Sequence, residues 1–315
     1  MKYIFRGTAF ISGFCIFMLL LTILLPDPFG RAYQRALVYQ YKYYQSLQGN
    51  KITFVGNSSL SFGLDLDRME ALTGRPCAIL GNHGGYGMSF LMEMSKSNMQ
   101  EGDIIVLELV ENYIDTCGED LLLTGIGHEY EMYKFFIPEV RWKIFSYYPS
   151  YLKEMILYDL NGGYEPYVIY SMDSYDERGN MILDRPECVI PDPYTKEVAE
   201  IYTYQTYSGK AWNPLWVKYV KDYIAYCNLH GVKVYITLPC CYDKAVLSSK
   251  EDIDAFDGML KKTFGAAVIS KQSDYIFDRK YFFNGIMHCN NTGAKYRTER
   301  IYQDLLNAGA LPASP

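Results

Sequence analysis

A serine that follows a short apolar stretch is the first residue of this chain that could do chemistry. Residues 52–55 (ITFV) are apolar and residues 56–59 (GNSS) follow at once, so Ser58 lies where a strand would give way to a turn. A serine hydroxyl at such a turn can point at a substrate, but it is a weak nucleophile unless a base accepts its proton. The base is most often histidine. Of the four histidines, His288, in a loop ahead of a helix, is the best candidate, and His83, after a second apolar stretch, is the next.

Glycine and asparagine residues near His83 could supply the donors that an acyl-transfer reaction needs. Gly84 and Gly85 let the backbone come close to a ligand, so their N–H groups could stabilise a developing oxyanion. The side chain of Asn82 or Asn112 could add a further donor. A structural interpretation fits the same residues, because serines cap helices and glycines form tight turns between a strand and a helix.

These residues need a scaffold, and the hydrophobic pattern predicts one. Apolar and amphipathic stretches alternate along the chain, which indicates βαβ units and a parallel sheet covered on both sides. We expect strands at 52–55, 76–80, 103–110 and 232–238, a candidate fifth strand at 267–270, and helices at 65–72, 88–99, 212–230, 251–264 and 292–306. Because the loops after parallel strands converge at their carboxyl ends, the loops with Ser58, His83 and Asn112 would meet there.

The stretch from about 113 to 211 breaks this alternation. It is rich in Tyr, Pro, Asp and Gly, with a helical pattern only near 131–157. We therefore expect one α/β domain over 51–315, with a large insertion at about 113–211. The insertion would lie on the carboxyl edge of the sheet, where ligands bind in such folds.

The N-terminal residues predict a membrane anchor. Residues 7–25 contain no charged residue, and a helix of this length spans roughly 28 Å, enough to cross the ~30 Å hydrocarbon core. Lys2 and Arg6 precede it, which favours a single-pass protein with a cytoplasmic N-terminus and an extracytoplasmic body. A cleaved signal peptide is the alternative, but its apolar region should be shorter and end at small residues. We take 1–30 as the anchor and 31–50, which is polar and Tyr-rich, as a juxtamembrane helix leading away from the membrane.

Composition excludes several classes of protein. The net charge is −6 without a basic stripe, so nucleic acid is not an expected partner. Eight cysteines in 315 residues are too few for a disulfide scaffold, and CxxC and HExxH patterns are missing, so we expect neither a metal nor another cofactor. One cysteine lies in the apolar N-terminal segment. The other seven are an odd number, so at least one thiol stays free or pairs between chains.

Four stretches, in order, resemble sequence blocks of the SGNH (GDSL-like) hydrolases, in particular of membrane-anchored bacterial SGNH-like proteins. They are 55–60 (VGNSSL), 79–87 (ILGNHGGYG), 101–107 (EGDIIVL) and 281–288 (YFFNGIMH), the last followed by 291–293 (NTG) and 297–299 (RTE). Ser58 stands at the nucleophile position of the first block, and His288 at the catalytic histidine of the closing block. The resemblance covers about 50–112 and 232–308.

The resemblance implies a three-layer α/β/α, flavodoxin-like fold. It also implies ester chemistry, often on acyl groups of envelope or exported polysaccharides. Ser58 would attack the acyl carbonyl, and His288 would take its proton and later give it to the leaving oxygen. The N–H groups of Ser58 and Gly84, together with an asparagine side chain, would hold the oxyanion.

Two positions depart from the family pattern. The family has an Asp a few residues before the histidine, and Asn284 stands there. An amide can orient an imidazole but cannot stabilise imidazolium by charge. Asp278, Asp274 or a main-chain carbonyl could substitute. In the third block the family has Gly-x-Asn-Asp, whereas this chain offers only Asn112, within 110–113 (VENY).

We therefore expect a membrane-anchored serine esterase or O-acyltransferase that acts on an acylated envelope or secreted glycan outside the cytoplasm. Two alternatives stay open. The chain could be a catalytically inactive relative that binds glycan or is a scaffold of an export complex, which the two departures favour. It could also be a membrane-docked assembly partner whose Tyr-rich insertion holds another envelope protein.

Overall fold

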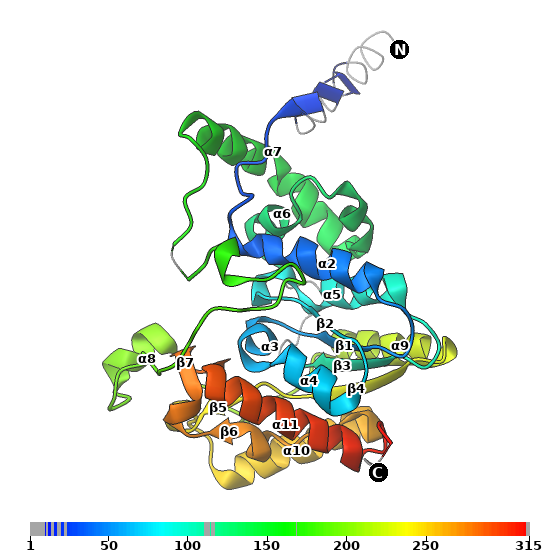
Figure 1. Ribbon diagram of the computed structural model, residues 1–315, viewed down its shortest axis with the longest axis vertical. Coiled ribbons are helices and arrows are strands. Elements are labelled where there is room, and N and C mark those ends of the chain that lie inside the picture. The colour runs from blue at the N-terminus through cyan, green and yellow to red at the C-terminus, as the bar shows by residue number, and fades with distance from the viewer. Residues whose placement is uncertain are drawn as a thin grey trace.

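A four-stranded parallel sheet forms the centre of the molecule (Figure 1). The computed structural model describes residues 10, 12–13, 16–17, 20–21, 24–109, 114, 117–167 and 169–312. The strands are β1 (Ile52–Val55), β2 (Cys77–Leu80), β3 (Ile104–Glu108) and β4 (Lys233–Thr237), in the order β2-β1-β3-β4. Each lies within a stretch that the hydrophobic pattern predicts, so the α/β class with a parallel sheet is confirmed.

The register of the strands brings their carboxyl ends to one edge of the sheet. Val55, the last residue of β1, pairs with Leu80 on β2 and with Leu107 on β3. Glu108, the last residue of β3, pairs with Thr237 at the end of β4. The loops that follow the strands therefore start side by side, at the edge where parallel α/β sheets bind their ligands.

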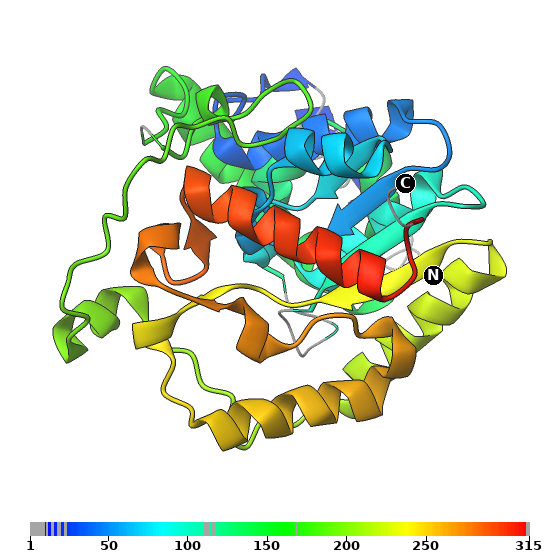
Figure 2. The same cartoon turned by 60° about the horizontal axis from the view of Figure 1, so that its bottom comes forward.

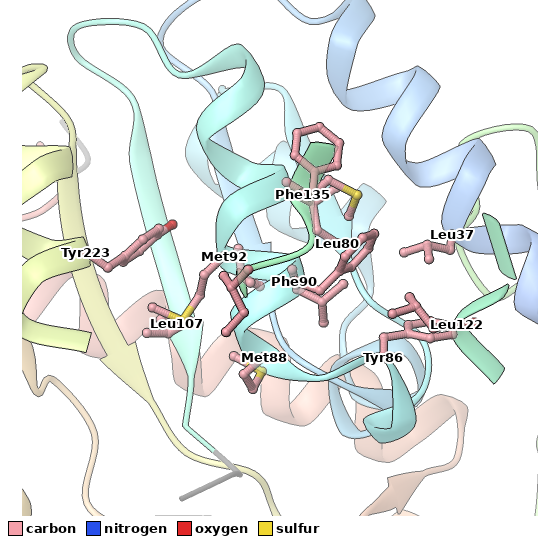
Figure 3. Packing of buried hydrophobic residues seen from close by; sticks show 14 of the residues in the cluster. Leu37, Leu80, Tyr86, Met88, Phe90, Met92, Leu107, Leu122, Phe135 and Tyr223 are labelled. Carbon is pink, nitrogen blue, oxygen red and sulfur yellow. The ribbon is translucent and has the colours of Figure 1, made fainter. Parts of the chain in front are cut away.

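One face of the sheet packs against helices from both halves of the chain. Val55, Leu80 and Leu107 belong to a large buried apolar cluster on this face (Figure 3). The helices whose side chains join the cluster are α2 (Ala36–Ser46), α5 (Met88–Ser95), α6 (Glu119–Ile126), α7 (Pro138–Leu160), α9 (Pro214–Leu229) and α10 (Lys250–Phe264). At roughly 25 cal/mol per Å² of apolar surface removed from water, this cluster is a main source of stability.

The opposite face packs against helices that carry or adjoin the candidate catalytic residues. Phe54, Ile79 and Val106 belong to the second apolar cluster. The helices on this side are α3 (Ser58–Gly63), α4 (Leu66–Thr73) and α11 (Asn291–Asn307), and Figure 2 shows α11 lying across the sheet. Neighbouring strand residues thus alternate between two apolar clusters, which explains why the strands are almost continuously apolar.

Local capping sets several helix boundaries. The Asp65 carboxylate accepts the N–H of Arg68 and begins α4, and Gly74 ends that helix in the left-handed conformation, with a φ of 63°. Ser249 and Asp252 form a capping box at the start of α10. These interactions are local in sequence, which is why the predicted and observed bounds of both helices differ by only one residue.

The remaining elements are short. They are α8 (Lys196–Tyr202), the parallel pair β5 (Cys241–Tyr242) and β6 (Ile276–Phe277), the antiparallel pair β7 (Phe282–Gly285) and β8 (His288–Cys289), and 3-10 helices at Tyr33–Arg35, Gly84–Tyr86, Lys96–Asn98, Tyr130–Phe135, Met172–Ser174, Asp243–Ala245, Gly265–Ala267, Gln272–Tyr275 and Arg279–Tyr281. The β7–β8 hairpin matters most for the site, because β8 packs against α3 and carries His288.

The candidate fifth strand at 267–270 is reduced to a single bridge. Helix α10 ends at Phe264, and Gly265 leaves it with a φ of 65°. A 3-10 turn then takes up residues 265–267, so only Val268 pairs with the sheet, through Ile236. The turn removes the first residue of the expected strand, and the remaining residues form one bridge to the sheet.

The expected helix at 31–50 is present in part, as a 3-10 turn followed by α2. Helix α2 packs on the sheet and buries Leu37, Tyr41 and Tyr44. The Tyr44 hydroxyl donates to the carbonyl of Ser95 at 2.5 Å. Buried tyrosines of this polar, Tyr-rich stretch thus place their rings in the core, as tyrosine can do when its hydroxyl keeps a hydrogen-bond partner.

Residues 117–211 lie between β3 and α9, where the insertion is predicted. Helices α6 and α7 belong to the first apolar cluster, so this half of the insertion is part of the main body. The chain then runs along the side of the molecule to α8 (Figure 1). In the described part of the chain, no helix is long and apolar enough to cross a membrane. The predicted anchor at 7–25 falls largely on residues outside that part.

Candidate active site

Ser58 is the first residue of helix α3, directly after the turn that follows β1. Asn57 is the N-cap of this helix, and its side-chain oxygen accepts the N–H of Ser59 at 2.8 Å. The cap fixes the backbone on both sides of Ser58, while the Ser58 side chain stays partly exposed. A serine in this position has a fixed backbone and a hydroxyl free to meet a base.

His288 is positioned to act as the base for Ser58. Its Nε2 lies 2.9 Å from the Ser58 hydroxyl oxygen, and its Nδ1 lies 3.0 Å from the side-chain oxygen of Asn284. The ring of Phe62 stacks on the imidazole, with 4.1 Å between centroids and 6° between planes. Residues 230 positions apart thus form the hydrogen-bonded series Ser58–His288–Asn284. We refer to it below as the candidate triad.

The surroundings of His288 keep its imidazole neutral. Burial, reinforced by the charges of Arg185 and His83, lowers the pKa of His288 to about 4. At neutral pH the ring is therefore unprotonated and can accept a proton from Ser58. Asn284 brings no negative charge that would raise this pKa, which is the physical consequence of an amide at the position where an acid is usual.

Tyr170, from the insertion, orients Asn284. The side-chain NH₂ of Asn284 donates to the Tyr170 hydroxyl at 3.2 Å, which leaves the Asn284 oxygen facing His288. That oxygen can only accept, so Nδ1 of His288 carries the proton and Nε2 presents its lone pair to Ser58. The Tyr170 ring also packs on Tyr33, with 5.2 Å between centroids. The insertion is therefore part of the site.

Two loops approach each other beside Ser58. Gly81 has a φ of 116°, and a Cβ on it would lie 1.9 Å from the carbonyl oxygen of Gly56, so only glycine fits. This contact brings the loop after β2 next to the loop after β1. A Cβ on Gly84 would lie 3.6 Å from the side-chain nitrogen of Asn57, so Gly84 and Asn57 are neighbours.

The approach of these two loops places several hydrogen-bond donors close to Ser58. Within the described residues, the N–H groups of Ser58 and Gly84 and the side-chain NH₂ of Asn57 donate to no protein acceptor. Three donors next to a serine hydroxyl are what an oxyanion of a tetrahedral intermediate would require. Asn57 is not among the donors predicted from the sequence, where Asn82 and Asn112 are the candidates.

The other two residues of the predicted loop have structural contacts. Asn82 is 1% exposed, and its side-chain NH₂ donates to the carbonyl of Tyr33 at 2.9 Å. His83 accepts the N–H of Gly85 through Nδ1 at 2.9 Å and caps the turn that presents Gly84. Burial lowers the pKa of His83. Neither side chain contacts Ser58, so Asn82 and His83 stabilise the loop and are not part of the candidate triad.

The alternative acids do not reach His288. Asp278 is exposed and accepts the N–H of Lys280. Asp274 forms an ion pair with Arg300 at 2.7 Å. Asn112 lies outside the described residues. Asn284 is therefore the residue that the structure places against the imidazole, as the spacing to His288 predicts.

A buried ion pair supports the backbone behind Ser58. Arg297 on α11 pairs with Glu108 at the end of β3, and both side chains are fully buried. Arg297 also donates to the carbonyl of Ser59 at 2.6 Å and to that of Leu238 at 3.1 Å. Burial alone would lower the pKa of Arg297, but the Glu108 carboxylate raises it, so the pair stays ionic. Two strand ends and the nucleophile turn are thereby tied to one side chain.

Sequence reasoning missed the functional contacts of Asn57, Tyr170 and Arg297. The RTE stretch pointed to the neighbourhood of Arg297, but nothing in the insertion distinguished Tyr170 from many other tyrosines. No group of three or more His, Cys, Asp or Glu side chains among the described residues could hold a metal ion.

Comparison with known proteins adds no relative. No protein-family model matches the chain, and no curated protein or solved structure is significantly similar to it. The classification therefore rests on the architecture itself: an α/β protein with a four-stranded parallel sheet flanked by helices.

Proposed function

We propose that this protein is a serine esterase or O-acyltransferase of the SGNH type, with the three-layer α/β/α, flavodoxin-like architecture of that family. The observation that carries the proposal is the 2.9 Å contact between the Ser58 hydroxyl and Nε2 of His288. The two residues lie on elements from opposite ends of the chain. They meet at the carboxyl edge of a parallel sheet, beside three unused donors.

The geometry supports a two-step acyl transfer. His288 takes the proton of Ser58 as the serine oxygen attacks an acyl carbonyl, and the N–H groups of Ser58 and Gly84 with the NH₂ of Asn57 hold the resulting oxyanion. The imidazolium then gives its proton to the leaving oxygen, which releases the alcohol and leaves an acyl-serine. Water or a sugar hydroxyl attacks that ester in the second step, again with His288 as base.

The Asn284 amide makes this catalysis slow rather than impossible. It holds the imidazole in the productive tautomer, but it cannot offset the positive charge that His288 gains in the transition state. Asn284 therefore positions His288 through a hydrogen bond but does not add the charge stabilisation that an acid in its place would supply. We therefore expect an enzyme that favours activated acyl groups or transfers them at a low rate.

A cavity close to the triad suits a sugar. It has a volume of about 230 Å³ and lies at the carboxyl ends of β3 and β4, with Met287, the neighbour of His288, in its wall. Aromatic and amide side chains line it, and these can stack on a sugar ring and hydrogen-bond its hydroxyls. They are Tyr207, Trp212, Phe256, Gln205 and Gln272. This lining supports an acylated glycan of the cell envelope, or an exported one, as the substrate.

The apolar segment 7–25 supports attachment to the membrane, with the body outside the cytoplasm. Its described side chains include Phe10 and Leu24, each 76% exposed, which a bilayer would cover. In this arrangement the candidate site faces envelope glycans and partner proteins of the same compartment.

Labelling with a fluorophosphonate probe tests the proposal, because the probe reacts with an activated serine. The full chain in detergent should be labelled, and Ser58→Ala should abolish the labelling. Ser61→Ala is the matched control, since Ser61 lies on the same helix and its side chain is buried, where the probe does not reach it. Equal labelling of wild type and Ser58→Ala would exclude Ser58 as the nucleophile.

A catalytically inactive, glycan-binding relative is the second candidate. The amide of Asn284 against His288 favours it, because the triad then lacks a charge. A folded wild type that binds acylated glycan but is not labelled, and releases no acyl group from the glycan, would support this alternative over the enzyme.

A further inference from the structure

Two buried cysteines lie in contact next to the candidate triad. Cys240 comes shortly after the end of β4, and Cys289 follows His288 on β8. Their Sγ atoms are 3.3 Å apart, and both side chains are 0% exposed. A disulfide bond is about 2.0 Å long, so a relative shift of roughly 1.3 Å would bring the two sulfurs to bonding distance.

The surroundings of the pair favour reaction at Cys240. Burial alone would raise the pKa of the Cys240 thiol, but the hydrogen bond with Cys289 and the nearby charge of Arg297 lower it. The same hydrogen bond and burial raise the pKa of Cys289. Cys240 is therefore the thiol that ionises first, and the thiolate is the form that attacks a disulfide.

The neighbouring cysteine does not compete for this contact. Cys241 points its Sγ at the carbonyl of Tyr242, 3.8 Å away. Cys227 is buried in α9, in the apolar cluster on the other face of the sheet. Cys241 and Cys227 are therefore buried thiols of the same chain outside the Cys240–Cys289 contact, and they serve as controls for it.

We propose that Cys240 and Cys289 form a disulfide bond that ties the end of β4 to the strand carrying His288. The oxidant is the disulfide of oxidised glutathione or of a thiol–disulfide oxidoreductase. The Cys240 thiolate attacks one of its sulfurs and displaces the first thiolate. Cys289 then gives its proton to solvent, attacks the mixed disulfide at Cys240 and displaces the second. Two thiols are oxidised, and the oxidant's disulfide is reduced to two thiols.

The bond forms late in folding, when Arg297 and Cys289 already lie beside Cys240 but an oxidant still reaches the two sulfurs, because both are fully buried in the folded protein. The two cysteines are 49 positions apart, so the bond closes a long loop that contains β5, β6, α10 and β7. It restrains the hairpin that presents His288 and Asn284. The inference does not depend on catalysis, because the bond is detected by mass and not by activity.

Peptide mapping of the full chain tests the bond. The chain is synthesised cell-free with detergent micelles and a mixture of oxidised and reduced glutathione, then denatured without reductant in the presence of iodoacetamide and digested. We expect the peptides of Cys240 and Cys289 to appear joined, 2 Da lighter than the sum of the two thiol peptides, and to separate on reduction. Alkylation of both thiols, or Cys240 joined to another cysteine, would overturn the proposal.

Thermal unfolding gives a second measurement. Wild type that has been unfolded and refolded in reductant, which opens the long disulfide-closed loop, should have a Tm about 8 °C lower than the oxidised protein. Cys227→Ser should show the same drop, whereas Cys240→Ser/Cys289→Ser should show none. A drop of equal size in the double variant would overturn the assignment of the effect to this bond.

Discussion

Strand β3 carries a buried ion pair at each end, and the two pairs differ in what they hold. At the amino end, Asp103 pairs with Lys51 at 2.5 Å and also accepts the N–H groups of Lys51 and Gln100. At the carboxyl end, Glu108 pairs with Arg297, which donates a hydrogen bond to the carbonyl of Ser59. Both pairs are almost wholly buried, so each is costly to break.

The same kind of interaction, a buried ion pair, thus stabilises the fold at the amino end of β3 and supports the candidate site at its carboxyl end. Besides the Lys51 ammonium, the amino-end carboxylate binds backbone N–H groups at residues 51 and 100, away from the candidate site. Among the described residues, the carboxyl-end pair leaves one oxygen of Glu108 and Nε of Arg297 without hydrogen-bond partners, and the pair lies directly behind the nucleophile turn. Parallel strands gather their loops at the carboxyl end, so that is where a buried charge can support chemistry.

The largest change in the labelling rate should come from adding a negative charge beside His288, at the carboxyl edge of the sheet. Asn284→Asp places a carboxylate against His288 and supplies the charge stabilisation that the amide lacks. We expect the rate of fluorophosphonate labelling to rise, by less than the roughly 10⁴-fold that separates Asp from Asn in a comparable triad, because that factor includes a wrong imidazole tautomer, which Asn284 avoids here. Asn161→Asp, at the exposed end of α7, is the control. An unchanged rate would mean that the Asn284 position does not limit the reactivity of Ser58.

Breaking one ion pair at a time tests the comparison directly. Lys51→Met and Arg297→Met each leave a buried carboxylate unpaired, so each should lower the free energy of unfolding by about 3–5 kcal/mol in urea titrations. Only Arg297→Met should also slow labelling, measured at a temperature where both variants are folded. Equal slowing by both would show that the two ends do not differ in function.

The pH dependence of labelling should reveal the neutral base. His288, with its pKa lowered to about 4, accepts a proton only when it is unprotonated. Labelling should therefore be constant from pH 8 to about 5 and fall about tenfold per unit below pH 4. In Asn284→Asp the new charge should raise this pKa and move the fall to higher pH. Circular dichroism at each pH checks that the fold persists, and a fall centred near pH 6.5 in the wild type would contradict the buried, neutral base.

The smallest effect should come from the insertion. Tyr170→Phe removes the hydroxyl that orients Asn284, and a single neutral hydrogen bond is worth about 1 kcal/mol, so labelling should slow about fivefold. Tyr167→Phe is the control, since Tyr167 lies on the same segment and is 72% exposed. Equal rates for the two variants would mean that Asn284 is held without Tyr170.

Residues close in sequence account for the successful predictions of the fold. The four strands follow from short runs of buried apolar residues, and α4 and α10 follow from caps within three residues of their starts. The difference at 267–270 comes from contacts that a local pattern does not contain: a 3-10 turn takes up residue 267, and only Val268 pairs with the sheet. The burial of α2 on the sheet is likewise a tertiary contact that the polar, Tyr-rich pattern of 31–50 does not contain.

The sequence by itself determined which residue types could react. Ser58 after a strand and His288 before a helix are local patterns that their neighbours in sequence reveal, whereas Asn284, four positions before His288, is singled out only by the resemblance to the SGNH hydrolases. Only the tertiary structure decided which of the remaining candidates meet them. It placed Asn57 rather than Asn82 beside Gly84, held Asp278 away, and brought in Tyr170, Arg297 and the Cys240–Cys289 contact. These contacts join residues that are 27 to 238 positions apart, and they follow from the packing of whole elements, which local spacing does not encode.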